Sequence, residues 1–418
     1  MNHQPNASPI ERYVGMDVHK HYVMVGGVNR QKEWVLRPRK VRVSSFRSWA
    51  ERNLKPTDAV VIESTSNAWT IYDIVAPLVG YTVVADPRQV FEIAKAKVKT
   101  DKRDIERLLR LLIADMVPEV WVPPRPVREL RSLISYRWRL NKQITMTKNR
   151  LHSVLHQHNL AAPEGGLFRD KNQDWWDDQV FSPMVAIQVE HDLKLLKQLE
   201  EHRVAINQEL ARLSNTEPWD SQMVYLMQIP GFGVILGMIA LSAIGDITRF
   251  SHPKKLVGYA GLGAGVHDSG EKYSGKGITK QGRKEFRWAM VEVAWRAVGA
   301  YPYWKSQFET LKKRLHSNQA IVAIARKLLI TVWHVLTKQA AYQHATEEDI
   351  AYKMLIWSWN MDEKALDGMS RQQFAKYGLL RLGVGQDLTR IVRSNLPRRI
   401  APAEEVLKLK PELRPPNL

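Results

Sequence analysis

The sequence predicts an α/β domain with a mixed β-sheet, then a long helical region, then a mainly α-helical C-terminal part. Two observations support this fold class. Over residues 13–112, short apolar runs bounded by turn residues alternate with stretches of helical periodicity, as in α/β domains. Over 128–158 and 185–213, apolar residues recur at helical spacing for many turns. The 418 residues suffice for roughly two or three domains of ordinary size.

Three predicted strands follow one another at the start of the α/β domain, and helices then alternate with strands. A hairpin meander followed by crossover connections produces a mixed sheet with helices packed on it. This order of elements is that of the RNase H-like fold. The expected elements are, in order, strands over 13–17, 21–28 and 41–43, a helix from Ser44 or Ser45 through Trp49, a strand over 59–63, a helix over 69–79, a strand over 81–85, and a helix from Val90 onward whose apolar stripe contains Ile105, Leu108, Leu109 and Leu112.

Composition shifts divide the chain into four expected parts. A proline-rich segment over 121–125 marks the end of the first domain, 1–125. A basic helical and coiled-coil region follows over 126–220, although the heptad register of its second long helix is imperfect. A further domain is expected over 221–340. The C-terminal extension, 341–418, ends in a basic tail, and its sequence assigns it no role.

The chain is strongly basic and lacks cysteine. Lys and Arg outnumber Asp and Glu by 62 to 43, a formal net charge of +19, which indicates a polyanionic partner, most simply nucleic acid. The absence of cysteine excludes disulfides, thiolate zinc sites and cysteine nucleophiles, and it fits a reducing cytoplasm. The N-terminus lacks a signal-peptide pattern, and the longest uncharged run, 221–245, is broken by Pro230-Gly231. We therefore expect a cytoplasmic, nucleoid-associated protein with no membrane partner.

Four carboxylates are the candidate catalytic and metal-ligating residues. Asp17 and Glu63 each end a predicted strand. Asp101 and Asp104 lie in the sequence KTDKRD at the start of a helix, and their spacing of three puts them on one helix face. Converging carboxylates repel one another unless cations neutralise them, and hard oxygen ligands select Mg²⁺ or Mn²⁺. Two such ions about 3.5–4 Å apart would clamp the attacking and leaving oxygens of a phosphodiester.

Each of these acids also fits a structural role when it is taken singly. Asp17 suits a turn, and Glu63 suits a solvated strand end. Asp101 and Asp104 suit the positive end of a helix. The combination of the four in this strand order is what favours a metal site.

A glycine-rich segment with many cations holds the candidate nucleophile. Ser269 lies in a loop with few large side chains, and its hydroxyl could attack a phosphodiester if a base or metal activates it. Ser274 and Thr279 are rival hydroxyls in the same stretch. The structural alternative is a phosphate-binding loop in which the serine is incidental.

Upstream of this segment, IPGFG at 229–233 has the shape of the turn in a helix-hairpin-helix. Glycines in such a turn let backbone N–H groups approach a phosphate. The alternative is a tight turn between two core helices.

Basic residues gather beside both candidate sites. Residues 88–150 contain 16 basic and 7 acidic side chains, and residues 272–314 contain 11 and 3. Docking of a nucleic-acid backbone needs such a surplus. The expected nucleic-acid contacts are Lys99, Lys102, Arg103, Lys272, Lys280, Arg283 and Arg287.

Together these segments resemble the DEDD-type transposases of bacterial insertion sequences. That family includes recombinases guided by a bridge RNA, and the Piv DNA invertases are related to it. The matching stretches lie within residues 13–339 and are YVGMDVHK, VIESTSNAW, DPRQVFEIAKAKVKTDKRDIERL, IPGFG, IGDITRF, YAGLGAG and SGEKYSGKGITKQGRKEFRWAM.

The resemblance implies a RuvC-like RNase H domain and a transposase domain. The acids Asp17, Glu63, Asp101 and Asp104 would hold Mg²⁺ (or Mn²⁺) in the first. The family's serine falls on Ser269, which would attack DNA and form a covalent phosphoserine link. The acids of one protomer and the serine of another would share a composite site, in a dimer or tetramer on donor DNA, target DNA and the guide RNA.

The chain departs from the family pattern in two places. After Glu63, Ser66-Asn67 stand where a small residue or glycine is usual before the aromatic residue. The extension 341–418 has no counterpart in the pattern.

Three functional hypotheses follow. The leading one is an RNA-guided DNA recombinase that uses Ser269 as nucleophile. The second is a metal-dependent nuclease like the Holliday-junction resolvases, in which activated water attacks and Ser269 only contacts DNA. The third is a non-catalytic nucleic-acid-binding scaffold, in which the four acids do not converge. A covalent protein–DNA adduct separates the first two, and the carboxylate separations test the third.

Overall fold

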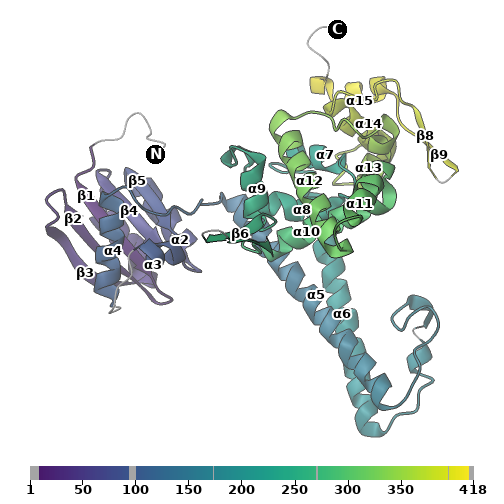
Figure 1. Cartoon of the computed structure of the whole chain (residues 1–418), viewed down its shortest axis with the longest axis horizontal. Coiled ribbons are helices and arrows are strands. Elements are labelled where there is room, and N and C mark those ends of the chain that lie inside the picture. The colour runs from purple at the N-terminus through teal and green to yellow at the C-terminus, as the bar shows by residue number, and fades with distance from the viewer. Residues whose placement is uncertain (1–8, 94–99, 173, 270–271, 394, 414–418) are drawn as a thin grey trace. The chain divides into compact units, whose positions relative to one another are not determined.

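Figure 1 shows the computed structural model of the chain. It describes residues 9–93, 100–172, 174–269, 272–393 and 395–413, and the side chains of residues 266–276 lie outside the described part. The chain divides within the proline-rich segment into two units, Met1–Pro123 and Pro124–Leu418.

A five-stranded mixed sheet forms the first unit, as the order of elements predicts. Strand β1 (Arg12–Val18) pairs antiparallel with β2 (Tyr22–Asn29) and parallel with β4 (Asp58–Glu63). Strand β3 (Trp34–Arg42) adds antiparallel to β2, and β5 (Tyr81–Ala85) adds parallel to β4. The strand order is therefore β3-β2-β1-β4-β5, with β1 at the centre.

Strand β3 is longer than the sequence predicts. The prediction of a strand over 41–43 was wrong in extent, because β3 begins at Trp34 and has nine residues. It lies at the edge of the sheet, and several of its side chains, including Arg37 and Arg39, are charged. Charged side chains protect an edge strand from pairing with other chains, and they also remove the apolar alternation by which a strand is recognised.

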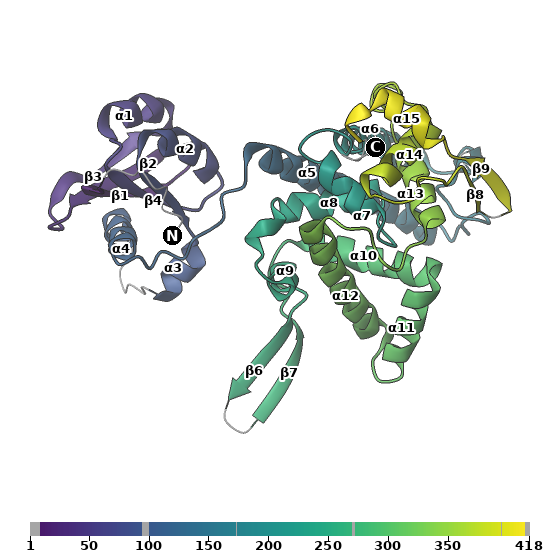
Figure 2. The same ribbon diagram turned by 90° about the horizontal axis from the view of Figure 1, so that it is seen from above.

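Helices cover both faces of this sheet, as Figure 2 shows. Helices α1 (Phe46–Asn53) and α2 (Ala68–Val75) lie on one face, and α4 (Asp101–Ile113) lies on the other, after the short helix α3 (Pro87–Ile93). A β-carbon at Gly26 would lie 3.0 Å from the Cγ2 atom of Ile105, so the glycine lets α4 approach the sheet closely.

Alternate residues of the central strands face the two layers. Val14, Met16, Val60 and Ile62 belong to the core beneath α1 and α2. Ala59, Val61, Leu108 and Leu111 belong to the core beneath α4. The predicted apolar stripe of α4 is buried as expected. This alternation fixes which face each following strand residue occupies.

The second unit begins with two long helices, α5 (Arg125–Gln157) and α6 (Pro183–Leu213), which pack side by side as an extended pair (Figure 1). Their shared core includes Leu140, Leu151 and Leu196.

The rest of this unit is mainly helical. Among the described residues, helix α12 is the one whose length and composition would suit a membrane span, but half of its apolar window is buried inside the unit, and nine of its side chains belong to the core. The remaining elements are α7 (Asp220–Met227), α8 (Val234–Ile244), α9 (Pro253–Tyr259), β6 (Ala264–Ser269), β7 (Lys272–Ile278), α10 (Lys284–Ala300), α11 (Pro302–Lys312), α12 (Ser317–Lys338), α13 (Glu347–Trp359), α14 (Arg371–Arg381), β8 (Arg390–Arg393), β9 (Leu396–Arg399) and α15 (Ala403–Leu409).

Candidate active site

The two strand-end acids lie on the same face of the sheet. Met16 of β1 is paired with Ile62 of β4, so Asp17 and Glu63 follow one residue later in neighbouring parallel strands. Asp17 comes two residues after Gly15, and Glu63 comes two residues after Val61. Gly15 and Val61 face α4. Because a strand alternates its side chains, both acids project on the α4 side of the sheet.

The first turn of α4 supplies the other two acids. Thr100 caps the helix, since its hydroxyl accepts a hydrogen bond from the backbone N–H of Arg103, 3.3 Å away. Asp101 and Asp104 therefore sit at the positive end of the helix, where a negative charge is favoured.

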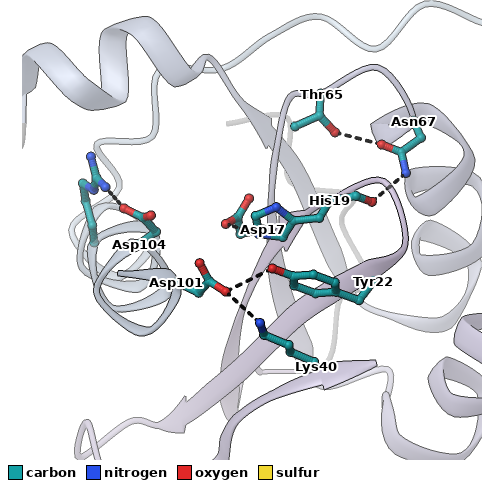
Figure 3. A network of polar contacts seen from close by, with 9 residues as sticks. Asp17, His19, Tyr22, Lys40, Thr65, Asn67, Asp101 and Asp104 are labelled. Atoms are coloured by element: carbon teal, nitrogen blue, oxygen red, sulfur yellow. Dashed lines mark hydrogen bonds and ion pairs between the residues drawn. The ribbon is translucent and has the colours of Figure 1, made fainter. Parts of the chain in front are cut away.

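Three side chains converge where these elements meet. One ligand atom each from Asp17, His19 and Asp101 lies within 4.8 Å of the others. The Nε2 atom of His19 is 3.0 Å from Oδ2 of Asp17. Figure 3 shows Asp17 and His19 next to each other, with Asp101 directed toward them from α4. The sheet and the helix thus gather residues that are 84 positions apart in the sequence.

A second layer of contacts orients the Asp101 carboxylate. The hydroxyl of Tyr22 donates to its Oδ2 atom at 3.2 Å, and Nζ of Lys40 lies 3.5 Å from the same oxygen (Figure 3). The contact with Tyr22, whose ring centroid is 4.4 Å from Nζ, raises the pKa of Lys40, and the charge of Asp101 acts in the same direction. Tyr22 and Lys40 thus hold the Asp101 carboxylate in a defined orientation.

Asn67 ties the loop after β4 to the loop after β1. Its side-chain amide donates to the backbone carbonyl of His19 at 3.1 Å, and Thr65 contacts its amide oxygen at 3.1 Å (Figure 3). The departure from the family pattern at Ser66-Asn67 therefore provides a direct bond between the two strand ends that carry Asp17 and Glu63.

These residues fit a divalent cation. Asp17 is 8% exposed, and a carboxylate so deeply buried requires a positive or hydrogen-bonding partner. Its ion-pair contact among the described residues is His19, whose Nε2 atom lies 3.0 Å from Oδ2 of Asp17. A carboxylate and an imidazole nitrogen this close together suit ligation of a common ion, as does the second carboxylate, Asp101.

His19 is the site residue that the sequence reasoning missed. Its signal was present, because it follows Asp17 by two residues in YVGMDVHK and comes directly after the end of β1 at Val18. Of the four predicted acids, the structure brings Asp17 and Asp101 together. The carboxylates of Glu63 and Asp104 face the same side but lie outside this group of ligand atoms, within the described residues.

Asp104 already has a partner. It is 5% exposed and forms an ion pair with Arg107, one turn further along α4. The side chain of Arg107 is itself 15% exposed. The carboxylate therefore compensates a largely buried guanidinium, whatever else it binds.

We expect Asp104→Asn to lower the free energy of unfolding by about 1–3 kcal/mol, because it weakens a charged hydrogen bond to Arg107 in a buried setting. Chemical denaturation of the purified variant measures this loss. Glu106→Gln, a neighbour on the same helix, is the control and should stay within about 0.5 kcal/mol of the wild type. Equal stability of Asp104→Asn and the wild type would contradict the structural role.

The second unit presents the serine-bearing segment as a β-hairpin. Ser269 ends β6 and is paired with Lys272 at the start of β7, and the hairpin projects from the helices beside α9 (Figure 2). The side chains of Ser269 and Lys272 lie outside the described part of the structure. Backbone bonds from Thr279 to Gly263 (3.0 Å) and from Lys280 to Gly261 (3.1 Å) close the base of the hairpin.

Arginine 131 anchors the helices from which this hairpin projects. Its guanidinium donates to the carbonyls of Ser242 (2.7 Å) and Ala243 (3.0 Å) at the end of α8, and it lies 3.4 Å from the hydroxyl of Tyr259 in α9. Burial lowers the pKa of Arg131 to about 10. The hairpin therefore projects from a support that α5 holds in place.

The turn at 229–233 is filled by protein contacts. A β-carbon at Gly231 would lie 2.1 Å from the carbonyl oxygen of Val293 in α10, and its φ of +85° also requires glycine. The carbonyl of Phe232 accepts a hydrogen bond from Nζ of Lys353 in α13, and burial lowers the pKa of that lysine to about 8. These contacts favour the tight turn between core helices over an open phosphate-binding turn.

The expected nucleic-acid contacts lie in differing surroundings. Lys102 and Arg103 are exposed on α4, and Lys280 is exposed at the base of the hairpin. Arg283 precedes α10, and Arg287 donates to the carbonyl of Lys280 at 3.0 Å, so part of its hydrogen-bonding capacity supports the hairpin. Lys99 lies outside the described residues.

Comparison with known proteins decides the family. A family model for the DEDD transposases of the IS110 type matches residues 14–160, and one described as the transposase IS116/IS110/IS902 family matches residues 223–309. Together they cover more than half of the chain. The chain belongs to the IS110 family of transposases. The first match implies an RNase H-like fold for the sheet domain, in agreement with the strand order of the first unit.

Curated relatives of this transposase extend the match. The transposase of insertion sequence element IS1111A from Coxiella burnetii is 23% identical over 79% of this chain and 91% of its own length. The pilin gene-inverting protein of Moraxella bovis is 25% identical over 69% of this chain and 83% of its own length. A Sinorhizobium fredii homologue, y4qE, is 26% identical over 56% of this chain and spans 57% of that protein.

The two family models leave parts of the transposase unmatched. They reach neither the second long helix α6 nor any residue after 309. The first includes all four predicted acids and His19, and the second includes Ser269. A DEDD domain implies dependence on a divalent metal, which agrees with the convergence of Asp17, His19 and Asp101.

Proposed function

We propose that this chain is a site-specific DNA recombinase of an insertion sequence, which cuts and rejoins DNA through a covalent link to Ser269. The observation that carries the proposal is the buried Asp17 carboxylate, which meets the His19 Nε2 atom at 3.0 Å and lies close to the Asp101 carboxylate at the carboxyl end of the central strands. A buried carboxylate requires a positive or hydrogen-bonding partner, and a divalent cation shared by these three side chains would supply a positive one.

The acids on the α4 face would hold Mg²⁺ or Mn²⁺. We assign Asp17, His19 and Asp101 as ligands, and Glu63 and Asp104 as acids that complete the site when DNA is bound. The ion, when present, neutralises the negative charge that develops on the scissile phosphate. Both ions accept carboxylates, and an imidazole nitrogen is a ligand that the transition metal Mn²⁺ accepts more readily than Mg²⁺ does.

The chain's own residues would then carry the transfer. The Ser269 oxygen forms a bond to phosphorus as the bond between phosphorus and the leaving sugar oxygen breaks. The proton of the serine hydroxyl is lost, and the leaving oxygen takes up a proton. One phosphoester replaces another, so the reverse attack by a DNA hydroxyl can reseal the strand without ATP.

The family resemblance extends the proposal to partners. We propose that acids and serine come from different copies of the chain, that the assembly acts on donor and target DNA in the cytoplasm, and that a guide RNA selects the sites. The net charge of +19 supports a nucleic-acid assembly of this kind. Sequencing of RNA that co-purifies with the protein from its host tests the guide.

A covalent adduct tests the proposed function. We expect that the purified chain, incubated with labelled DNA carrying the ends of its insertion sequence and with Mg²⁺ or Mn²⁺, retains label after denaturation in detergent. A chelator should abolish the adduct and leave binding of the DNA intact, because binding depends mainly on basic side chains. Metal-dependent cleavage without any adduct would support the resolvase-like nuclease instead. Absence of both cleavage and adduct on element ends, with binding retained, would support the scaffold.

A further inference from the structure

The C-terminal extension carries an arginine-rich β-ribbon, residues 390–399, formed by β8 and β9. Its sequence, RIVRSNLPRR, contains four arginines and no acid. The ribbon lies beyond both stretches that match the family models. Ile391 is 1% exposed and anchors it to the second unit, where β8 packs near α13. The ribbon is thus a fixed part of the fold.

The inward face of the arginine-rich ribbon is held by stacking on α13. The guanidinium of Arg398 lies 4.7 Å from the ring centroid of Trp359 and 5.9 Å from that of Tyr352. Arg393 lies 5.4 Å from the Tyr352 ring and is paired with Asp349. Cation–π contacts of this kind orient arginine side chains and the backbone that carries them. These two arginines therefore serve to position the ribbon.

The outward face presents the other two arginines side by side. Arg390 of β8 is directly opposite Arg399 of β9, and both are exposed. Arg399 lies 3.6 Å from Glu405, whereas among the described residues no acid pairs with Arg390. Like charges directly opposite each other destabilise a strand pair. Folding alone does not favour this arrangement, whereas an anion placed between the two guanidinium groups would.

The chemistry of this face selects a phosphate backbone. Two adjacent guanidinium groups match phosphate oxygens in number and geometry. Next to them, Val392 (59% exposed) is paired with Pro397, which gives the face a small apolar surface. A two-stranded β-ribbon is one of the elements that the major groove of duplex DNA admits.

We propose that the arginine-rich ribbon binds the backbone of duplex DNA through Arg390 and Arg399. The inference rests on the proposed function, which supplies DNA as the partner. It gives the extension 341–418 a role in holding DNA, in addition to the basic residues expected to contact nucleic acid in the matched domains.

The test uses the full chain, a 30-base-pair duplex of unrelated sequence and a chelator, so that no chemistry takes place. We expect the variant Arg390→Gln/Arg399→Gln to bind about tenfold more weakly near 100 mM salt. The slope of log affinity against log salt should fall by about 1.8, because each phosphate that the variant no longer neutralises lowers the slope by about 0.9. The melting temperature should stay unchanged or rise, because the like-charge pair is removed.

A charge-matched control is available in the same unit. Lys197→Gln/Lys364→Gln removes two exposed cations, on α6 and after α13, that lie outside both basic stretches, and should leave the affinity and the salt slope near the wild-type values. Equal losses of affinity in both variants would overturn the proposal, since net charge alone would explain them. An unchanged slope, or a loss confined to single-stranded RNA of equal length, would overturn it as well. Failure of the wild-type chain to form an adduct would count against the proposed function and would leave this binding result intact.

Discussion

Asp17→Asn is expected to lower the rate of metal-dependent DNA cleavage by about a thousandfold. Asp17 ends the central strand and lies almost fully buried between His19 and the first turn of α4. Replacing one carboxylate oxygen by an amide removes a charged ligand from the ion, and electrostatic stabilisation by such an ion is worth several kcal/mol, or about three orders of magnitude in rate. Cleavage of labelled element ends under single-turnover conditions measures the effect.

The same variant has a readout that does not depend on catalysis. Titration of Mn²⁺ into the purified protein should show weaker binding for Asp17→Asn and for His19→Gln, because we propose both side chains as ligands. Glu51→Gln is the matched control, because it removes one exposed carboxylate from α1 on the opposite face of the sheet. Wild-type cleavage and wild-type Mn²⁺ affinity in Asp17→Asn would contradict the assignment of the site.

The sheet domain could be predicted because its signals are local. The run over 59–63 is apolar on both faces, and the structure buries it between two layers. The apolar stripe of α4 fixes the face on which that helix packs. The sequence predicts the order of the elements along the chain, and the structure then shows that β1 lies beside β4 and that α4 covers the face on which Asp17 projects. The full extent of edge strand β3 was not predicted, because its charged side chains interrupt the apolar alternation by which a strand is recognised.

The contact partners of individual residues were harder to predict than the helices and strands that carry them. That Asp104 compensates Arg107 depends on the burial of both side chains, which no spacing rule gives. His19 was not predicted as a site residue, because a histidine after a strand has many structural uses. The approach of its Nε2 atom to Asp17 is what distinguishes it from a structural histidine. The turn at Gly231 has a sequence that also fits a phosphate-binding hairpin, yet the structure leaves no room for a β-carbon there, because the carbonyl of Val293, more than sixty residues away in sequence, occupies that space.

These cases share one physical reason. Strand and helix patterns report how a segment divides its residues between core and water, and that division is periodic along the chain. Partners of charged groups are set by contacts between segments, where small differences in distance decide whether a group binds a neighbour or an ion. The residues for a site can therefore be proposed from sequence, while the subset that converges requires the fold.

Ser269→Ala is expected to abolish the covalent adduct and to lower strand exchange to below about one part in ten thousand of the wild-type rate. Loss of a nucleophile removes the covalent route entirely, and what remains is binding and electrostatic stabilisation. DNA binding should stay near the wild-type level, because a single neutral hydroxyl contributes little to contacts with a polyanion. Detergent gels of labelled DNA measure the adduct, and gel shifts in a chelator measure binding.

The rival hydroxyls of the same hairpin provide the controls for that experiment. Ser274 lies on β7, and Thr279 follows the strand, where its backbone N–H closes the base of the hairpin. Ser274→Ala should keep the adduct, because the position that matches the family's serine is Ser269. An adduct that persists in Ser269→Ala and disappears in Ser274→Ala would move the nucleophile to β7. If the adduct persists in both serine variants and is lost only when Thr279 is replaced, the nucleophile would lie at the base of the hairpin instead. Either result would leave the proposed metal site of Asp17, His19 and Asp101 as a separate assignment with its own test.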